Sequence, residues 1–143
     1  MKTIQRSALV MHSASAMYGL VNDVTAYPQF LPWCVGTEVL GRGDDWMEAR
    51  VDVSKGGVTQ SFVTRNKLEV DRFIEMRLVE GPFTALSGVW HFKPLMEDAC
   101  KVVLDLTFDM DNAMLKSTVG KVLDQAANLM VDAFCKRADE VYG

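Results

Sequence analysis

Apolar residues recur at every second position through much of the chain, which is the pattern of β-strands that bury one face. In the stretch 46–53, apolar residues occupy the odd positions from Met47 to Val53, and a tryptophan and three charged residues occupy the even ones. Turn-forming residues such as the pair Gly56-Gly57 separate these stretches. The alternation predicts seven strands, at Thr3–Met11, from Gly36 onward, and at 46–53, Val58–Leu68, Arg72–Val79, Leu86–Lys93 and Lys101–Phe108.

The spacing changes to that of a helix near both ends of the chain. Ser13 is a favourable N-cap for a short helix over Ala14–Asp23. After it, Pro28 and Pro32 exclude a long regular helix, and we expect a bent connection or a single helical turn. At the other end, Ala113–Tyr142 places apolar residues along one stripe and predicts a long helix. At 1.5 Å per residue this helix is about 45 Å long, enough to cross a whole sheet.

The order of these elements predicts an α+β fold in a single domain, residues 1–143. We expect a curved seven-stranded antiparallel sheet wrapped around the long C-terminal helix, with two short helices after the first strand. A strongly twisted sheet of this size curls, and its concave face must be covered. The cover is only one helix wide, so the arrangement predicts a groove or cavity between helix and sheet.

Short motifs spread over nearly the whole chain resemble one known family. They are Arg6–Val10 (RSALV), Val21–Val24 (VNDV), Tyr27–Cys34 (YPQFLPWC), Ser61-Phe62, Thr64–Asn66, Glu80–Phe83, Leu86–Phe92 and Met130–Phe134. The sequence is similar to the coenzyme Q-binding protein family of the START-like (SRPBCC, helix-grip) superfamily. Bacterial members of that family are called RatA ribosome-association toxins, or oligoketide cyclase/lipid transport proteins.

The resemblance implies the helix-grip fold and two functions of different classes. The first is binding of ubiquinone in support of respiration. The second is binding of the large ribosomal subunit, which blocks subunit association and inhibits translation. Neither function follows from composition or periodicity.

The inner faces of the predicted strands and helix carry many large apolar side chains. Taken singly, each of them fits an ordinary packed core. Together, and with nine methionines in the chain, they favour a deformable tunnel for a long apolar molecule. We therefore expect non-enzymatic binding of a hydrophobic small molecule, which the resemblance suggests is ubiquinone or a related isoprenoid lipid. The expected ligand-binding residues are Phe30, Trp33, Phe62, Met76, Leu78, Phe83, Leu86, Trp90, Phe92, Leu123, Met130 and Phe134.

Residues that usually carry catalysis are sparse and scattered. The two histidines, His12 and His91, lie far apart, and no group of His, Cys, Asp and Glu residues has zinc-like spacing. Neither a glycine-rich phosphate loop nor a nucleophile-elbow motif is present. The three cysteines are odd in number and widely spaced, which indicates a reducing compartment rather than a disulfide framework. We expect no catalytic residue, no metal site and no cofactor.

Net charge limits the expected partners. A formal net charge of −4 argues against a general electrostatic grip on nucleic acid, and we expect no DNA partner. The large ribosomal subunit is the alternative partner to a hydrophobic ligand. Its candidate contacts share one face of adjacent predicted strands, where acidic residues are interleaved with them. These contacts are Arg50, Arg65, Lys67 and Arg77.

The sequence also suggests a location. No apolar stretch approaches the roughly 20 residues needed to span a bilayer. The first 11 residues alternate between polar and apolar, unlike a signal peptide. We expect a cytoplasmic protein that makes transient contact with the inner membrane.

Overall fold

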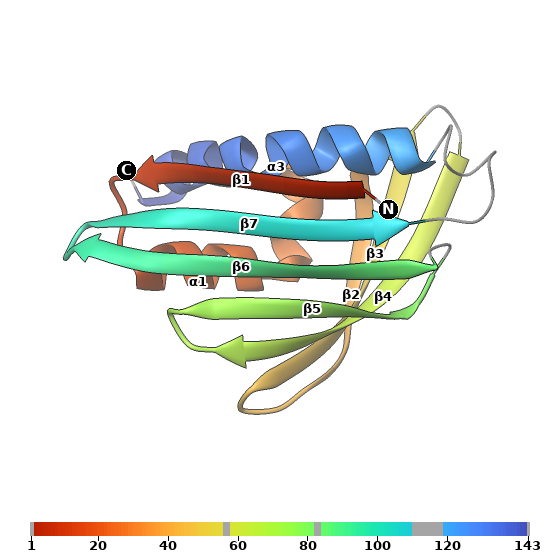
Figure 1. Ribbon diagram of the computed structural model, residues 1–143, viewed down its shortest axis with the longest axis horizontal. Coiled ribbons are helices and arrows are strands. Elements are labelled where there is room, and N and C mark those ends of the chain that lie inside the picture. Colours follow the sequence, from red (N-terminus) through yellow and green to blue (C-terminus); the bar gives the residue numbers. More distant parts are fainter. Residues whose placement is uncertain (1, 56–57, 82–83, 110–118, 143) are drawn as a thin grey trace.

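The computed structural model describes residues 2–55, 58–81, 84–109 and 119–142, without the side chains at 2, 55, 58, 119–124 and 126–128. Seven strands and three helical segments follow one another in the expected order (Figure 1). The strands are β1 (Lys2–Val10), β2 (Cys34–Arg42), β3 (Trp46–Lys55), β4 (Val58–Glu69), β5 (Phe73–Glu80), β6 (Ala85–Met96) and β7 (Ala99–Asp109). The helical segments are α1 (Ala14–Asn22), the 3-10 helix η1 (Val24–Gln29) and α3 (Val119–Tyr142). Every predicted strand is present, and most extend beyond the predicted bounds.

The strands form one antiparallel sheet in the order β1-β7-β6-β5-β4-β3-β2. In Figure 1, β2, β3 and β4 run across the direction of β1, β7 and β6, so the sheet curls around α3. Register shifts interrupt three of the strand pairs, β2–β3, β4–β5 and β6–β7. Such irregularities bend a strand and increase its twist, which lets a sheet curl this tightly. The curved antiparallel sheet and its covering helix confirm the expected fold class.

The chain between β1 and β2 follows the predicted capping and proline signals. The Ser13 hydroxyl oxygen accepts a hydrogen bond from the Ala16 amide at 3.0 Å and caps α1. Pro28 lies inside η1, which is therefore a short 3-10 helix rather than a longer α-helix. The Tyr27 hydroxyl donates to the Val21 carbonyl oxygen, joining η1 to the preceding helix. The bent connection or single helical turn expected here is in part a six-residue 3-10 helix, which lies beside β2.

Helix α3 is held against the sheet by aromatic packing. The Phe134 side chain is fully buried, and its ring lies 5.4 Å from Tyr27, 5.3 Å from Phe30 and 5.4 Å from Trp90 between centroids. These edge-to-face contacts join α3 to η1 and β6. The segment 113–118, where the sequence predicts the start of this helix, lies outside the described residues.

Polar contacts fix the C-terminal half of α3. Asp139 Oδ1 lies 2.7 Å from His12 Nε2, just after β1. Arg137 Nη2 donates to Gln29 Oε1 at 2.9 Å. Together these contacts tie the end of α3 to both β1 and η1. None of the helices in the described part of the chain is long and apolar enough to cross a membrane.

Candidate ligand-binding cavity

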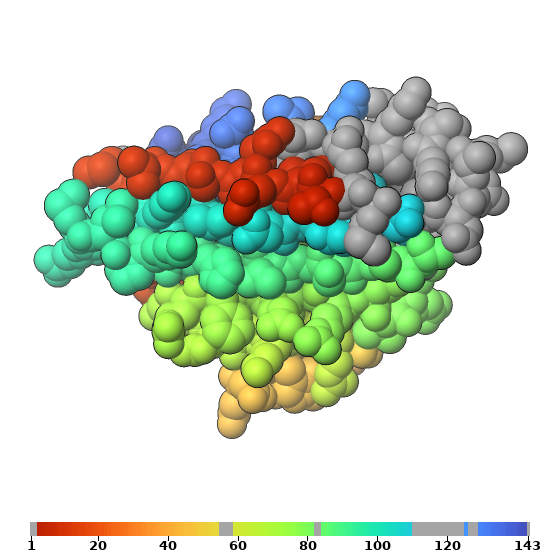
Figure 2. Space-filling view, viewed as in Figure 1, coloured from red at the N-terminus to blue at the C-terminus, as the bar shows by residue number. Residues whose placement is uncertain are grey.

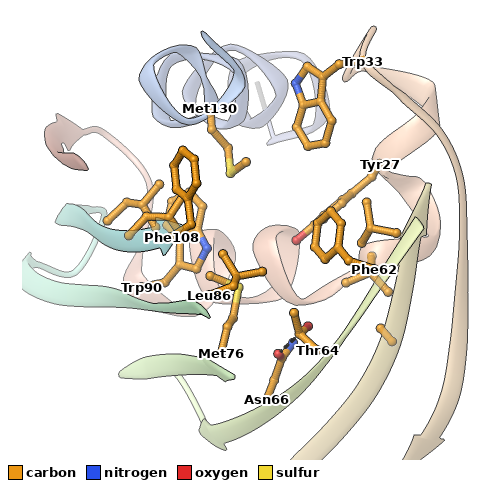
Figure 3. Close-up of a pocket in the computed structure, with 15 residues that line it drawn as sticks. Tyr27, Trp33, Phe62, Thr64, Asn66, Met76, Leu86, Trp90, Phe108 and Met130 are labelled. Atoms are coloured by element: carbon orange, nitrogen blue, oxygen red, sulfur yellow. Dashed lines mark hydrogen bonds between the residues drawn. The ribbon is translucent and has the colours of Figure 1, made fainter. Parts of the chain in front are cut away.

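An apolar cavity lies between the inner face of the sheet and α3 (Figure 3). Its volume is about 90 Å³. Side chains from η1, the following loop, β3 to β7 and α3 form its wall, so the curl of the sheet creates the space. The lining residues are Val24, Tyr27, Trp33, Ala49, Val51, Phe62, Thr64, Asn66, Met76, Leu86, Trp90, Leu104, Leu106, Phe108 and Met130.

The structure brings half of the expected ligand-binding residues to this wall. These residues are Trp33, Phe62, Met76, Leu86, Trp90 and Met130. Figure 3 shows Met130 reaching in from α3 toward the strands that carry Met76 and Phe62. Phe83 and the side chain of Leu123 lie outside the described residues.

Four other expected residues are not among those that line this cavity. Phe92 and Phe134 are buried in the core, where Phe92 stacks on Trp90 with ring centroids 6.4 Å apart. Phe30 packs against Phe134 and lies 5.2 Å beneath the Arg137 guanidinium. Leu78 is half-buried against the same core. All four pack in or against the core, and their contact with a ligand stays a prediction.

Two buried polar residues of the cavity, Thr64 and Asn66, were missed by sequence reasoning. They are 6% and 5% exposed, and the Thr64 hydroxyl donates to Asn66 Oδ1 at 3.0 Å. Strand alternation contained a signal for them, because Phe62, Thr64 and Asn66 are successive residues of one face of β4. Buried polar side chains are normally hydrogen-bonded, and each of these two has the other as a partner.

Gly88 allows the middle strands to approach each other closely beside the cavity. On β6 it lies opposite Met76 on β5 and Leu106 on β7, both of which line the cavity. A Cβ atom at this position would lie 2.9 Å from both Met76 Cε and Leu106 Cδ1. Any larger residue would force these two cavity-lining side chains to shift.

Titratable chemistry is scarce around the cavity. Burial raises the pKa of the Tyr27 hydroxyl, which keeps it protonated at neutral pH. Burial, with Asp132 and Asp139 nearby, also raises the pKa of the Cys135 thiol to about 11. Such a thiol is a poor nucleophile. Within the described ranges, no three His, Cys, Asp or Glu residues are grouped to hold a metal ion.

The outer face of the sheet carries the candidate ribosome contacts. Figure 2 shows the outer side of β1, β7, β6 and β5, which lie next to one another as neighbouring bands. Arg50 Nη1 lies 2.7 Å from Glu38 Oε2, and Arg77 Nη2 lies 3.1 Å from Glu75 Oε1. The Arg65 guanidinium stacks 4.3 Å over the Trp46 ring. Arg65 Nη1 also lies 3.9 Å from Glu48 Oε1, so each of these three arginines has a carboxylate neighbour within the sheet.

Comparison with known proteins gives one consistent assignment. A family model described as polyketide cyclase / dehydrase and lipid transport matches residues 10–135. The ribosome association toxin RatA of Pseudomonas aeruginosa is 54% identical over 140 residues, which cover 98% of this chain and 97% of that protein. The mitochondrial coenzyme Q-binding protein COQ10 of Dictyostelium discoideum is 28% identical, over 92% of this chain and 66% of that protein.

Solved structures share the fold. A START superfamily protein from Mycobacterium smegmatis has a TM-score of 0.81 at 23% identity, covering 97% of this chain and 98% of that one. The Zhui aromatase/cyclase from a Streptomyces species has a TM-score of 0.83 at 18% identity, covering 99% and 96%. The expected START-like resemblance and helix-grip architecture are confirmed. The chain belongs to the polyketide cyclase / dehydrase and lipid transport family.

Proposed function

We propose that this protein associates with the large ribosomal subunit, blocks subunit association and thereby inhibits translation. The observation that carries this proposal is the 54% identity, over nearly all of both chains, to a protein named ribosome association toxin RatA. A relative from Vibrio cholerae with the same name is 48% identical over all 143 residues. The sequence alone placed ligand binding first and ribosome association second, and the names of the relatives favour the reverse order.

The charges of the protein suggest how it contacts the subunit. The net charge is −4, and Arg50, Arg65 and Arg77 on the outer face have carboxylate or aromatic partners. A surface that grips RNA through many phosphates is strongly and locally basic. Docking through a ribosomal protein, with few phosphate contacts, agrees better with these ion pairs.

Raising the salt concentration is expected to weaken subunit binding only slightly. A protein that contacts one or two phosphates loses less than roughly tenfold in affinity between 50 and 200 mM salt, whereas one with six to ten contacts loses 10³–10⁵. Sedimentation of the protein with purified large and small subunits over this salt range measures the difference. Absence of large-subunit binding at low salt would contradict the proposed function.

Charge reversal on the outer face is the control for this measurement. The variant Arg65→Glu/Arg77→Glu should bind the subunit within about threefold of the wild type. A loss greater than tenfold, with folding preserved, would instead place the ribosome contact on this face.

A second candidate function is binding of a hydrophobic molecule in the cavity, with a ubiquinone-like isoprenoid as the proposed ligand. It is favoured by the almost entirely apolar wall and by two methionines, Met76 and Met130, that reach into the space. The volume of about 90 Å³ is below the roughly 300–1,000 Å³ of typical ligand pockets, so these flexible side chains must move on binding. Such a ligand would support respiration and would be collected during transient contact with the inner membrane.

Catalysis has little support in this cavity, although the fold also occurs in an aromatase/cyclase. Tyr27 is the sole ionisable side chain among the described lining residues, and its pKa is raised by burial. General acid–base catalysis needs a group whose pKa lies near the working pH. We therefore propose that the protein binds its ligand without transforming it.

Native mass spectrometry of freshly purified protein should detect a bound lipid, because an apolar ligand that binds the native state leaves slowly during purification. The mass difference and solvent extraction identify the ligand. We expect an isoprenoid quinone, and its addition should raise the melting temperature, since a ligand selective for the folded state stabilises it. Recovery of apo protein, with no thermal shift from quinones or fatty acids, would contradict this second function.

A further inference from the structure

The polar groups on the cavity wall are arranged so that an N–H group of Asn66 remains available as a hydrogen-bond donor. Thr64 lies between Ala49 on β3 and Leu78 on β5, and Asn66 lies between Met47 and Met76. These four neighbours have apolar side chains that form no hydrogen bonds with Thr64 or Asn66. The two polar side chains therefore bond to each other. Because the Thr64 hydroxyl donates to Asn66 Oδ1, the Asn66 amide is oriented with Nδ2 away from that bond.

Asn66 Nδ2 donates no hydrogen bond to any residue that the structure describes. The same holds for Trp90 Nε1, although Trp90 is only 2% exposed. In Figure 3 the indole nitrogen of Trp90 lies on the cavity side of the ring, and the Thr64–Asn66 pair lies at the far end of the cavity from α3. A third polar group, the Tyr27 hydroxyl, gives its proton to the Val21 carbonyl oxygen. The indole N–H groups of Trp90 and Trp33 lie elsewhere on the wall, so Asn66 Nδ2 is the N–H donor at the far end of the cavity from α3.

The wall also limits the charge of an occupant. Its described residues include no lysine, arginine or histidine. A carboxylate in this space would lose its hydration without gaining a cation, which is strongly unfavourable. An uncharged acceptor, such as a ketone, quinone, ester or amide oxygen, loses less hydration and gains a hydrogen bond.

We propose that Asn66 selects an uncharged, carbonyl-bearing apolar molecule and binds its oxygen at the inner end of the cavity, with Thr64 orienting the amide. The apolar remainder of the ligand then lies toward Met130 and Trp33, on the side of α3. This inference rests on the second candidate function, binding of a hydrophobic molecule in the cavity. It adds which end of the ligand enters first and which ligands bind more weakly, namely hydrocarbons and fatty-acid anions.

Two small probes of nearly the same shape, indane and 1-indanone, test the proposal. They differ by one carbonyl oxygen, and both are compact enough for this cavity after modest side-chain movement. Dissociation constants from NMR chemical-shift titrations give the ratio of indane to indanone affinity for each variant. The hydrophobicity of each probe is the same for every variant. A difference in the affinity ratio between two variants therefore reports on the contact with the carbonyl oxygen.

The Asn66→Leu variant is expected to shift this ratio about tenfold in favour of indane, since an unpaired carbonyl would be buried there. The double variant Thr64→Val/Asn66→Leu should show a similar shift in the ratio. It removes both partners of the hydrogen bond, so no buried polar group is left unpaired and the loss of stability is smaller. The control is Met76→Leu, which replaces one apolar side chain of the same cavity wall by another. It should change the affinities for indane and for 1-indanone by the same factor.

Each outcome decides a separate point. If both probes bind the wild type and the ratio is the same in Asn66→Leu, the role of Asn66 is wrong and cavity binding stands. An equal ratio shift in Met76→Leu likewise overturns the assignment to Asn66. If neither probe binds the wild type, cavity binding itself fails and this inference fails with it.

Discussion

Replacing Phe134 by alanine is expected to lower the free energy of unfolding by about 3–5 kcal/mol, the usual loss when a buried phenylalanine is truncated. The Phe134 side chain is fully buried and joins three aromatic rings from η1, the residue after it and β6. Its removal leaves a void that rigid rings cannot fill. Urea unfolding measures the change, and the melting temperature should fall by on the order of 10 °C.

Leu129→Ala is the matched control for this experiment. Leu129 lies on the same helix and is 62% exposed, so its truncation should change stability by less than about 0.5 kcal/mol. If Phe134→Ala and Leu129→Ala lower stability equally, the aromatic cluster does not hold α3 against the sheet.

Replacing Met130 by glutamate is expected to weaken ligand binding by at least about 100-fold. Met130 lines the cavity from α3, and a carboxylate there loses hydration with no cation on the described wall to compensate. The ligand identified by mass spectrometry, or 1-indanone, serves as the probe. Binding to the large ribosomal subunit should remain within about threefold, provided that the ribosome contact lies away from the cavity.

Leu129→Glu introduces the same charge one residue earlier, on the exposed side of α3, and should leave both activities unchanged. Comparison of the two glutamate variants therefore removes the effect of net charge. Should Met130→Glu abolish subunit binding as well while remaining folded, the ligand and ribosome functions are coupled, and the proposal that they are separable is wrong.

Most of the fold was predictable because hydrophobic alternation depends only on which face is buried. The stretch 46–53 is a strand with Met47, Ala49, Val51 and Val53 buried, as the alternation predicts. Some strands also run beyond the predicted bounds, as in β6, which continues to Met96 past Pro94. The end of a strand such as β6 cannot be predicted from its local pattern, because the position of that end depends on how far the strand pairs with β7.

For the candidate site, the sequence predicted which strand residues face inward but not which of them line the cavity. Trp90 and Phe92 share one face of β6, yet only Trp90 lines the cavity. Their difference arises from α1, because Tyr18 packs edge-on against Phe92 at 5.8 Å. Which inward residue meets the cavity and which meets a helix is decided by tertiary packing. Thr64 and Asn66 were missed for a different reason, since a search for apolar lining residues passes over polar ones.

The pairing of β1 with β7 also has a consequence for how the chain folds during its synthesis. Lys2 lies opposite Phe108, and Val10 lies opposite Cys100, so the first strand has no neighbour in the sheet until the last one is made. At about 5–20 residues per second, β1 waits on the order of 5–20 s for its partner. Pairing over such a separation also requires closing a long loop, which slows folding. The α3 side of the cavity is made later still, so the cavity proposed to bind a hydrophobic molecule cannot close before α3 has been made.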